Sequence, residues 1–227
     1  MVFHHASLPV FTGKKLNMNP TQHLVILAKA PFMGRVKTRL AHDIGPLSAW
    51  VFYRKTLNVV VNPLANNAKW KTWLSVSPDM SIHKNHIWPT KAQRVRQGFG
   101  NLGQRMDRVM QKMPPGPVII IGADIPEIRP HHIADAFQVL GEKDTVFGPA
   151  QDGGYWLIGQ RRRPRILPLF TDVRWSSPHA LTDTIKNIPN GVNTGYVEEL
   201  SDVDDGASYQ KFLQRQRQRR LYMPNRA

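Results

Sequence analysis

The stretch Pro117–Ile128, PVIIIGADIPEI, decides the fold class of this chain. Its run of β-branched residues, Val118–Ile121, carries no polar alternation, which is typical of a strand buried on both faces of a helix-covered parallel sheet. The run ends at Gly122, and Asp124 follows. Because open α/β sheets bind ligands at the carboxyl ends of their strands, Asp124 is a candidate functional residue. The alternative is an Asp that forms a turn or caps the helix after Pro130.

The chain is strongly basic. Its 227 residues carry a formal net charge of +15, and the sequence pI is about 10.5. This excess favours an anionic partner, such as a phosphorylated small molecule, nucleic acid or an acidic membrane surface. The absence of cysteine excludes disulfides and thiolate zinc sites. No apolar run approaches the ~20 residues of a membrane span, and the first residues lack a signal-peptide pattern, so we expect a cytoplasmic protein.

Length and composition predict one domain. Residues 1–20 have no hydrophobic period and are expected to form a disordered leader, residues 21–216 the domain, and residues 217–227 a basic tail. Strands are predicted at 23–29, 69–76, 94–97, 118–121, 144–149, 155–159 and 192–199, and helices at 46–62, 102–113, 130–141, 177–188 and 207–220. This alternation indicates a three-layer α/β sandwich with a mostly parallel central sheet.

The predicted helices at 46–62 and 102–113 carry distinctive residues. The first is expected to end at Pro63, since proline disrupts a helix interior. Its predicted buried stripe consists of Leu47, Trp50, Val51, Leu57 and Val61. The second is rich in methionine, with Asn101 as its predicted N-cap. Its apolar positions have helical spacing and predict core packing: Leu102, Met106, Val109, Met110 and Met113.

A basic loop follows the first strand. It reads APFMGRVKTRL from Ala30 to Leu40, and its cations, with that of the preceding Lys29, surround Gly34; they are Lys29, Arg35, Lys37 and Arg39. A loop between a buried strand and a helix already favours anions through its backbone N–H groups, so these cations suit a diphosphate or triphosphate. The spacing is neither that of a Walker A loop nor that of a dinucleotide-binding glycine motif. The alternative is a solvated charged loop.

Carboxylates supply the second candidate group. Asp124 follows the central strand, Asp152 lies in a glycine turn, and Asp202 and Asp204 would share a face if their segment is extended. Two unit charges ~4 Å apart repel by roughly 4 kcal/mol at an effective dielectric near 20, so carboxylates that converge need a cation. Hard oxygen ligands beside phosphates indicate Mg²⁺ or Mn²⁺.

The glycine-rich segment that opens the methionine-rich helix is a further candidate. Gly98 and Asn101 could admit a nucleotide base or ribose, and a purely structural turn is the alternative.

Six motifs, taken in order, resemble those of one bacterial family: LAKAPFMGRVKTRL (27–40), QGFGNLGQRM (97–106), IGADIPEI (121–128), FGPAQDGGYWLIG (147–159), RWSSP (174–178) and DVD (202–204). The family is the rSAM/selenodomain-associated transferase type 1 group, which is similar to the nucleotide-diphospho-sugar transferases of GT-A type. Molybdenum-cofactor and phospholactate guanylyltransferases share that fold. The resemblance covers about residues 22–213. The chain departs from the family in having Asn101 where an acidic residue is usual, and Asp205–Ser208 where Thr-Pro-Glu-Asp is usual.

The resemblance implies a GT-A-like transferase that uses a nucleotide or nucleotide-sugar donor with Mg²⁺ or Mn²⁺. Asp124 would be the main metal ligand, with Asp204 or Asp202 as the second. Lys29, Arg35, Lys37 and Arg39 would hold the phosphates, and Lys37 is the candidate catalytic cation among them. Asp152 is the candidate catalytic base. The acceptor side would be lined by Gly153, Gly154, Tyr155, Trp175 and Ser176.

Glycosyl transfer from a nucleotide-diphospho-sugar to an unknown small-molecule acceptor is the favoured activity. One alternative is a nucleotidyltransferase that releases pyrophosphate from a nucleoside triphosphate. The other is a non-catalytic nucleic-acid-binding protein driven by charge, although the sequence contains no zinc-finger, RNP or KH signature.

Overall fold

The structure is a computed structural model that describes residues 20–89 and 92–222. The predicted leader, apart from Pro20, and the last five residues of the predicted tail lie outside the described residues. A seven-stranded sheet runs through the described part in the order β3-β2-β1-β4-β6-β5-β7. Its strands are β1 (His23–Lys29), β2 (Lys71–Ser77), β3 (Gln93–Arg96), β4 (Val118–Gly122), β5 (Thr145–Pro149), β6 (Tyr155–Gln160) and β7 (Thr194–Tyr196).

Six of these strands run in one direction. β1 pairs in parallel with β2 and β4, β2 with β3, and β5 with β7, whereas β6 is antiparallel to both β4 and β5. β5 therefore has the direction of β4, and the carboxyl ends of all strands except β6 lie at one edge of the sheet. The predicted mostly parallel sheet is confirmed. β7 is shorter than the predicted strand over 192–199.

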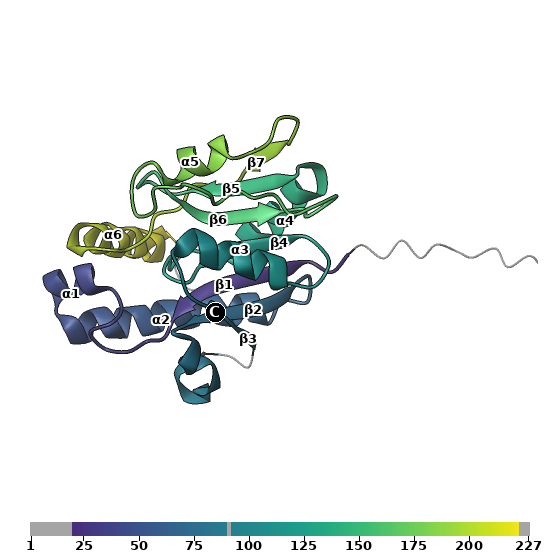
Figure 1. The fold of residues 1–227 in the computed structure, drawn as a ribbon. Helices are drawn as coiled ribbons and strands as arrows, with labels where there is room; N and C mark the ends of the chain where they lie inside the picture. Colours follow the sequence, from purple (N-terminus) through teal and green to yellow (C-terminus); the bar gives the residue numbers. More distant parts are fainter. Residues whose placement is uncertain (1–19, 90–91, 223–227) are drawn as a thin grey trace, which may run out of the picture.

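Helices cover both faces of the sheet (Figure 1). They are α1 (Thr38–Ile44), α2 (Pro46–Ala65), α3 (Leu102–Lys112), α4 (Pro130–Glu142), α5 (Ala180–Lys186) and α6 (Gly206–Tyr222), with short 3-10 turns η1 (Asp79–His83) and η2 (Asn85–Ile87) after β2. The predicted three-layer α/β sandwich is confirmed. No helix in the described residues is long and apolar enough to cross a membrane.

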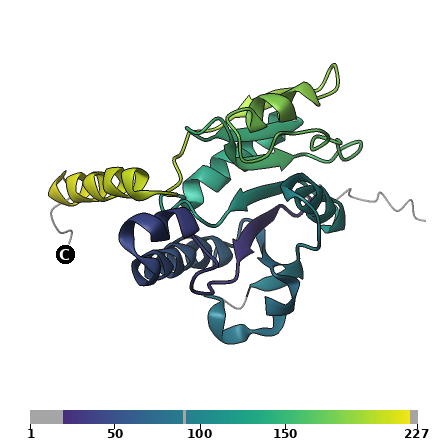
Figure 2. The ribbon, with the colours of Figure 1, turned by 60° about the vertical axis from the view of Figure 1, so that its left-hand side comes forward.

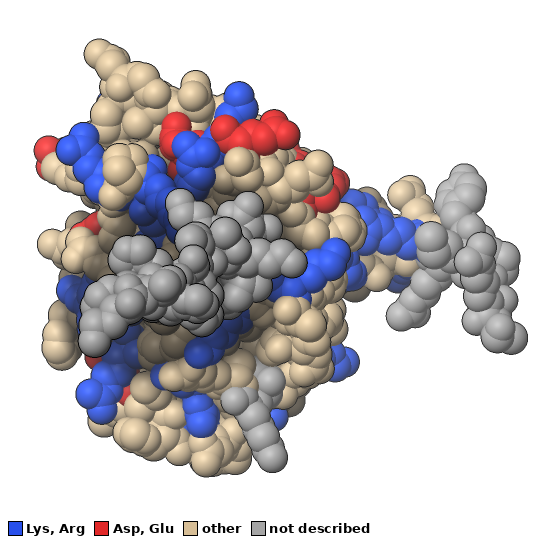
Figure 3. Space-filling model, turned by 90° about the vertical axis from the view of Figure 1, so that its right-hand side faces the viewer, with Lys and Arg blue, Asp and Glu red and all other residues tan. Residues whose placement is uncertain are grey.

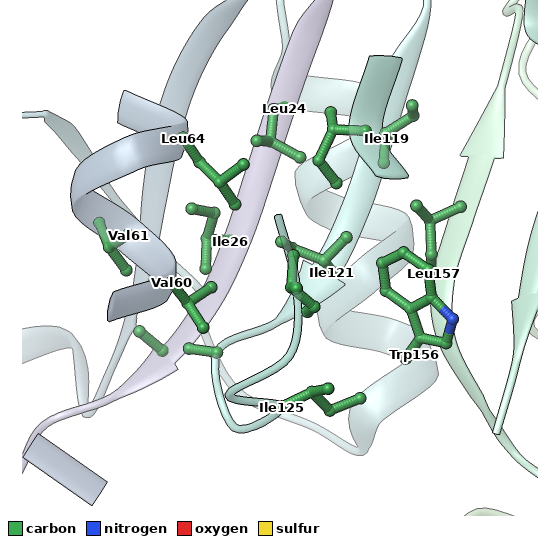
Figure 4. Packing of buried hydrophobic residues seen from close by; sticks show 14 of the residues in the cluster. Leu24, Ile26, Val60, Val61, Leu64, Ile119, Ile121, Ile125, Trp156 and Leu157 are labelled. Atoms are coloured by element: carbon green, nitrogen blue, oxygen red, sulfur yellow. The ribbon is translucent and has the colours of Figure 1, made fainter. Parts of the chain in front are cut away.

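The alternating faces of β1 and β4 divide the core into two halves. Leu24, Ile26, Ile119 and Ile121 pack under α2 and α4. Figure 4 shows Val60, Val61 and Leu64 of α2 on the side of Leu24 and Ile26, with Ile119 and Ile121 on the next strand, toward Trp156 and Leu157. Val25, Val118 and Ile120 face the other way and pack under α3 and α5. The methionines of α3 are buried in this second half, as predicted.

α2 corrects two sequence-based expectations. It continues through Pro63 to Ala65. A proline this close to the end of the helix removes only one hydrogen bond, and the fully buried Leu64 keeps the last turn in place. The Leu64 carbonyl accepts hydrogen bonds from Trp70 Nε1 (3.0 Å) and Thr72 Oγ1 (2.9 Å). Leu47, predicted to be buried, is 60% exposed in the first turn of α2.

Two further expectations need adjustment. Leu102, predicted to pack in the core, is 37% exposed at the first position of α3, whereas Gly103 and Met106 are buried. α6 runs on to Tyr222, two residues beyond the predicted helix over 207–220. Figure 2 shows α6 extending outward from the body of the molecule. Figure 3 shows Lys and Arg side chains along that projecting helix and in several other groups on this face, with fewer acidic side chains between them.

Candidate active site

The basic loop is fixed at its start by two side chains of α2. The buried hydroxyl of Tyr53 accepts a hydrogen bond from Lys29 N (3.1 Å) and donates one to Lys29 O (2.7 Å). Trp50 Nε1 donates to Pro31 O at 2.7 Å. The loop then reaches Lys37, whose backbone is left-handed (φ 47°) and forms the N-cap of α1. From this position the Lys37 side chain extends along the edge of the sheet, where its Nζ contacts carboxylates that follow β4 and β7.

Three carboxylates that are far apart in sequence converge at this edge. Each of Asp124, Asp202 and Asp204 offers an oxygen within 4.8 Å of the others. Asp124 follows β4, which is expected of a parallel-strand carboxyl end. The chain after β7 continues beside β5 through the Ala150–Leu200 bridge, which carries the other two to the same place. Asp124 does not cap α4, since the N-cap there is Arg129.

Two cations of the basic loop enter this carboxylate cluster. Lys37 Nζ lies 3.2 Å from Asp124 Oδ2 and 2.6 Å from Asp204 Oδ1, and its side chain is only 6% exposed. Burial opposes the charge on Lys37, but the charges of Asp124 and Asp204 outweigh it and raise the pKa of this ammonium. Arg39 also pairs with Asp204, from a side chain that is largely exposed. Burial disfavours the Asp204 carboxylate, and Lys37 and Arg39 nevertheless hold its pKa below the usual value.

Asp202 is the member of the cluster that these cations neutralise least. Burial, followed by the charges of Asp204 and Asp124, raises the pKa of Asp202 to about 7. Lys37 and Arg39 thus do not offset the burial and the two neighbouring carboxylates at Asp202, and another cation at the cluster would favour its ionised form. Three carboxylates with only oxygen donors fit Mg²⁺ or Mn²⁺, which prefer hard ligands. The residues present thus suit the divalent cation that the sequence predicted.

Asp152 lies outside the three-carboxylate cluster and faces it at longer range. It is exposed in the β5–β6 hairpin, where its Oδ1 accepts a hydrogen bond from Gly154 N at 2.9 Å. Its charge contributes to the raised pKa of Asp202, after burial and the two nearer carboxylates. Gly153 has φ +82°, and a Cβ there would lie 2.3 Å from Pro178 O, so glycine is required for the hairpin to pack on the segment before α5.

Tyr155 and Trp175, which were also predicted on the acceptor side, pack mainly against neighbouring parts of the protein. The Tyr155 ring packs edge-on against Phe147 and Trp175, its hydroxyl lies 3.3 Å from Thr184 Oγ1, and burial raises its pKa. Trp175 is half-buried and covers Gly103 at the start of α3. Ser176 is exposed with a left-handed backbone (φ 57°).

The glycine segment before α3 lies at the same sheet edge, after β3. Asn101 is the N-cap of α3, and it forms a capping box in which its Oδ1 accepts from Gln104 N at 2.9 Å. Gly98 (φ +77°) donates its N–H to Asp79 Oδ1. β3 and β4 are three strand spacings apart, about 14 Å. This segment is therefore close to the edge but not part of the carboxylate cluster.

Lys29, Gly34 and Arg35 are exposed on the basic loop. Within the described residues, the side chains of Lys29 and Arg35 make no hydrogen bond or ion pair. They are therefore available to an anion from solvent, unlike Lys37.

Sequence reasoning missed a buried ion-pair group beside the cluster. Glu127, in the loop after β4, lies 3.1 Å from both Arg215 and Arg219 of α6. The spacing of the two arginines, four residues apart on one helix face, was the available signal. It also missed that Asp205 and Ser208 form a capping box at the start of α6. The departure from the family pattern at 205–208 thus preserves a well-capped helix.

A second group, His131, His132 and Glu198, also brings three ligand-type atoms within 4.8 Å. Its contacts explain it without a metal. His132 Nδ1 accepts a hydrogen bond from Arg129 N at 3.0 Å, which leaves the ring proton on Nε2, 3.2 Å from Glu198 Oε2. Both ring nitrogens of His132 are therefore engaged, one at the start of α4 and the other with Glu198, which follows β7.

The fold is the α/β architecture of nucleotidyl- and nucleotide-sugar transferases, and relatives and structural neighbours of the chain are transferases. The chain belongs to the family described as uncharacterized protein conserved in bacteria (DUF2064), whose model matches residues 60–177, more than half of its length.

Relatives and solved structures agree with this class. A 2-phospho-L-lactate guanylyltransferase of Methanocaldococcus sp. (strain FS406-22) is 30% identical over 79 residues, which is 35% of this chain and only about a third (34%) of the relative. A protein from Desulfovibrio desulfuricans G20, provisionally assigned as a nucleotide-diphospho-sugar transferase, has a TM-score of 0.75 and 26% identity over 81% of this chain and 82% of its own. The Mycobacterium tuberculosis H37Rv protein Rv0371c, solved with manganese, shares the fold (TM-score 0.53, 15% identity, 86% and 99% covered).

Proposed function

We propose that the chain is a divalent-metal-dependent transferase that acts on a nucleotide-activated donor, with a nucleotide-diphospho-sugar as the donor. The observation that carries this proposal is the convergence of Asp124, Asp202 and Asp204 around the buried ammonium of Lys37. Carboxylates for a cation and cations for phosphates stand side by side at the ligand-binding edge of the sheet. Mg²⁺ or Mn²⁺ held there would neutralise charge on a leaving phosphate, which is usually a large catalytic contribution.

The protein's own side chains would divide the remaining tasks. Lys29 and Arg35, exposed on the basic loop, would attract and orient the phosphates, with Gly34 leaving room for their approach. Lys37 and Arg39 would stabilise the negative charge that develops on the leaving group. Such positioned cations act more strongly in a partly buried site than in water.

The acceptor would lie toward the β5–β6 hairpin. Asp152 is exposed there and would take the proton of the attacking hydroxyl, with Gly153, Gly154 and Ser176 as its neighbours. Tyr155 and Trp175 would form the apolar wall behind them, in keeping with their packing. The nucleoside would extend toward Gly98 and Asn101, at the same edge beyond β1 and β2.

The donor class rests on the Desulfovibrio structure, which matches four-fifths of both chains. The motifs described above further support placement with the rSAM/selenodomain-associated transferases. Nucleotidyl transfer is the second candidate, and the guanylyltransferase relative favours it. Both activities would use the same carboxylates and basic loop, so the reaction products separate them.

The test is incubation with Mn²⁺ and separate panels of nucleoside triphosphates and of UDP-, GDP-, ADP- and dTDP-sugars. Glycosyl transfer, or slow leakage of the sugar to water, releases a nucleoside diphosphate, whereas nucleotidyl transfer releases pyrophosphate. Either product should be lost in Asp124→Asn and retained in the control Asp172→Asn, which changes an exposed Asp outside the cluster. Pyrophosphate without sugar-nucleotide turnover would make the second candidate correct. Equal activity in both variants would refute the carboxylate assignment.

A further inference from the structure

We propose that helix α6 positions the carboxylate cluster, and that Glu127, Arg215 and Arg219 are positioning residues for it. The inference rests on the proposed cation site. The helix would hold Asp204 at its amino end and, through the two arginines, fix the loop that carries Asp124. Neither arginine touches the cluster itself.

The first link joins α6 to the Asp124 loop. Glu127 lies three residues after Asp124, and its side chain is 8% exposed. Ile125, Pro126 and Ile128 around it are buried, so the loop has little freedom to move without moving Glu127. Arg215 Nη2 and Arg219 Nη2 each lie 3.1 Å from a separate oxygen of this carboxylate. Removal of these partners would leave a buried charge without compensation and destabilise the folded state, so the ion pairs restrain the loop.

The second link joins α6 to Asp204. Asp205 is the N-cap of α6, and its Oδ1 accepts a hydrogen bond from Ser208 N at 2.8 Å. Ser208 Oγ in turn accepts from the N–H groups of both Asp205 and Asp204, each at 3.0 Å. The backbone of Asp204 is therefore bound directly to the first turn of the helix. Because a helix is stiff, a displacement at Arg215 or Arg219 is transmitted to this carboxylate.

A third set of contacts anchors α6 independently of the arginines. Tyr209 and Phe212 pack edge-on against Phe52 of α2, with ring centroids 5.2 and 5.8 Å apart. Gly206 N donates to Asp43 Oδ2 at 2.6 Å. These contacts leave the helix docked when the Glu127 ion pairs are removed. Loss of the ion pairs should therefore alter the geometry of the cluster without releasing the helix.

The experiment compares Glu127→Gln, Arg215→Met and Arg219→Met with the control Arg217→Met. Arg217 is exposed on the same helix and makes no ion pair in the described part of the chain. Amide hydrogen exchange of the metal-free proteins is measured in segments 123–129 and 201–206. Mn²⁺ affinity is then measured by electron paramagnetic resonance, well below the melting temperature.

We expect faster exchange in both segments for the first three variants, and Mn²⁺ binding weaker by about tenfold, the usual effect of losing a partner that orients ligands. Arg219→Lys should recover part of the affinity. Exchange that changes only in 123–129, or unchanged Mn²⁺ affinity in a folded variant, would overturn the proposal. If the wild type binds no Mn²⁺, the proposed cation site fails, and the exchange in segment 201–206 alone decides the role of α6.

Discussion

The ammonium of Lys37 lies 2.6 Å from Oδ1 of Asp204, although the two residues are 167 positions apart in the chain. The lysine side chain is almost completely buried and also reaches Asp124. In this arrangement Lys37 is the internal counter-ion of the carboxylate cluster. A divalent cation at the same oxygens would have to share them with the ammonium or displace it.

Lys37→Met should therefore separate metal binding from phosphate binding. Methionine keeps much of the length of the side chain but removes its charge, so Mn²⁺ alone should bind more tightly, by roughly tenfold, since about 1.4 kcal/mol corresponds to that factor. A nucleoside diphosphate should bind more weakly to the same variant. Calorimetric titration with Mn²⁺ and with the nucleotide measures both effects. Weaker Mn²⁺ binding would mean that the lysine does not compete for these carboxylates.

Arg35→Ala should reduce affinity in proportion to phosphate charge. The guanidinium is exposed and makes no ion pair within the described residues, so its removal should leave the fold unchanged. Loss of a charge-assisted hydrogen bond of about 1.5 kcal/mol would weaken a nucleoside diphosphate about tenfold and leave the free nucleoside unaffected. The matched control is Arg163→Ala, an exposed arginine in the turn after β6. Equal weakening of both ligands would indicate a structural loop.

Asn101→Ala should cost stability whatever the ligand. The side chain caps α3 through Gln104 N, and loss of such a cap costs about 1 kcal/mol. For a domain of this size the melting temperature should fall by roughly 2–4 °C. Asn101→Asp keeps the acceptor oxygen and should melt close to the wild type. Thermal unfolding of the three proteins without ligand decides the point, and an unchanged melting temperature in the alanine variant would contradict it.

His23 should make the fold sensitive to acid. Burial lowers the pKa of its imidazole, which accepts a hydrogen bond from Trp73 Nε1 at 3.2 Å. As the pH falls below about 6.5, the unfolded chain takes up a proton that the folded chain resists, so the free energy of unfolding decreases. The loss ends once the pH passes below the folded-state pKa. Asp202, whose pKa is raised to about 7, acts in the opposite direction over this range, so the test is a difference between two proteins. In urea unfolding between about pH 8 and pH 5, the free energy of unfolding should fall less, or rise more, with decreasing pH in His23→Gln than in the wild type. Some slope should remain, because burial and the neighbouring His131 also lower the pKa of His132. Identical slopes in both proteins would exclude His23 as a cause.

The parts of the fold that depend on local pattern could be predicted from the sequence. The unbroken apolar run of Val118–Ile121 predicts a central strand, and the rule for parallel sheets then places Asp124 at the ligand edge. Convergence with Asp202 and Asp204 was predicted as a possibility and is present. Their roles as metal ligands stay predictions.

The parts that depend on tertiary contact could not be predicted in the same way. Leu47 has the period of a buried stripe, but it stays exposed in the first turn of α2 because no described segment packs over it. Pro63 reads as a helix end until the contacts of Leu64 are known. Glu127 reads as an ordinary surface carboxylate, because its arginine partners lie more than eighty residues later in the chain. Helical period alone cannot identify such a partner.

The dispersed origin of the carboxylate cluster also has a consequence for synthesis of the protein. Lys37, Asp124 and Asp204 come from the beginning, middle and end of the chain, and the central strands β1, β2 and β4 are complete well before Asp204 is made. Domains begin to fold from the amino end while translation proceeds. A nascent chain stalled before residue 200 could thus form much of its sheet and yet lack two of the three carboxylates, Asp202 and Asp204. The cluster could be completed only after Asp204 has been made.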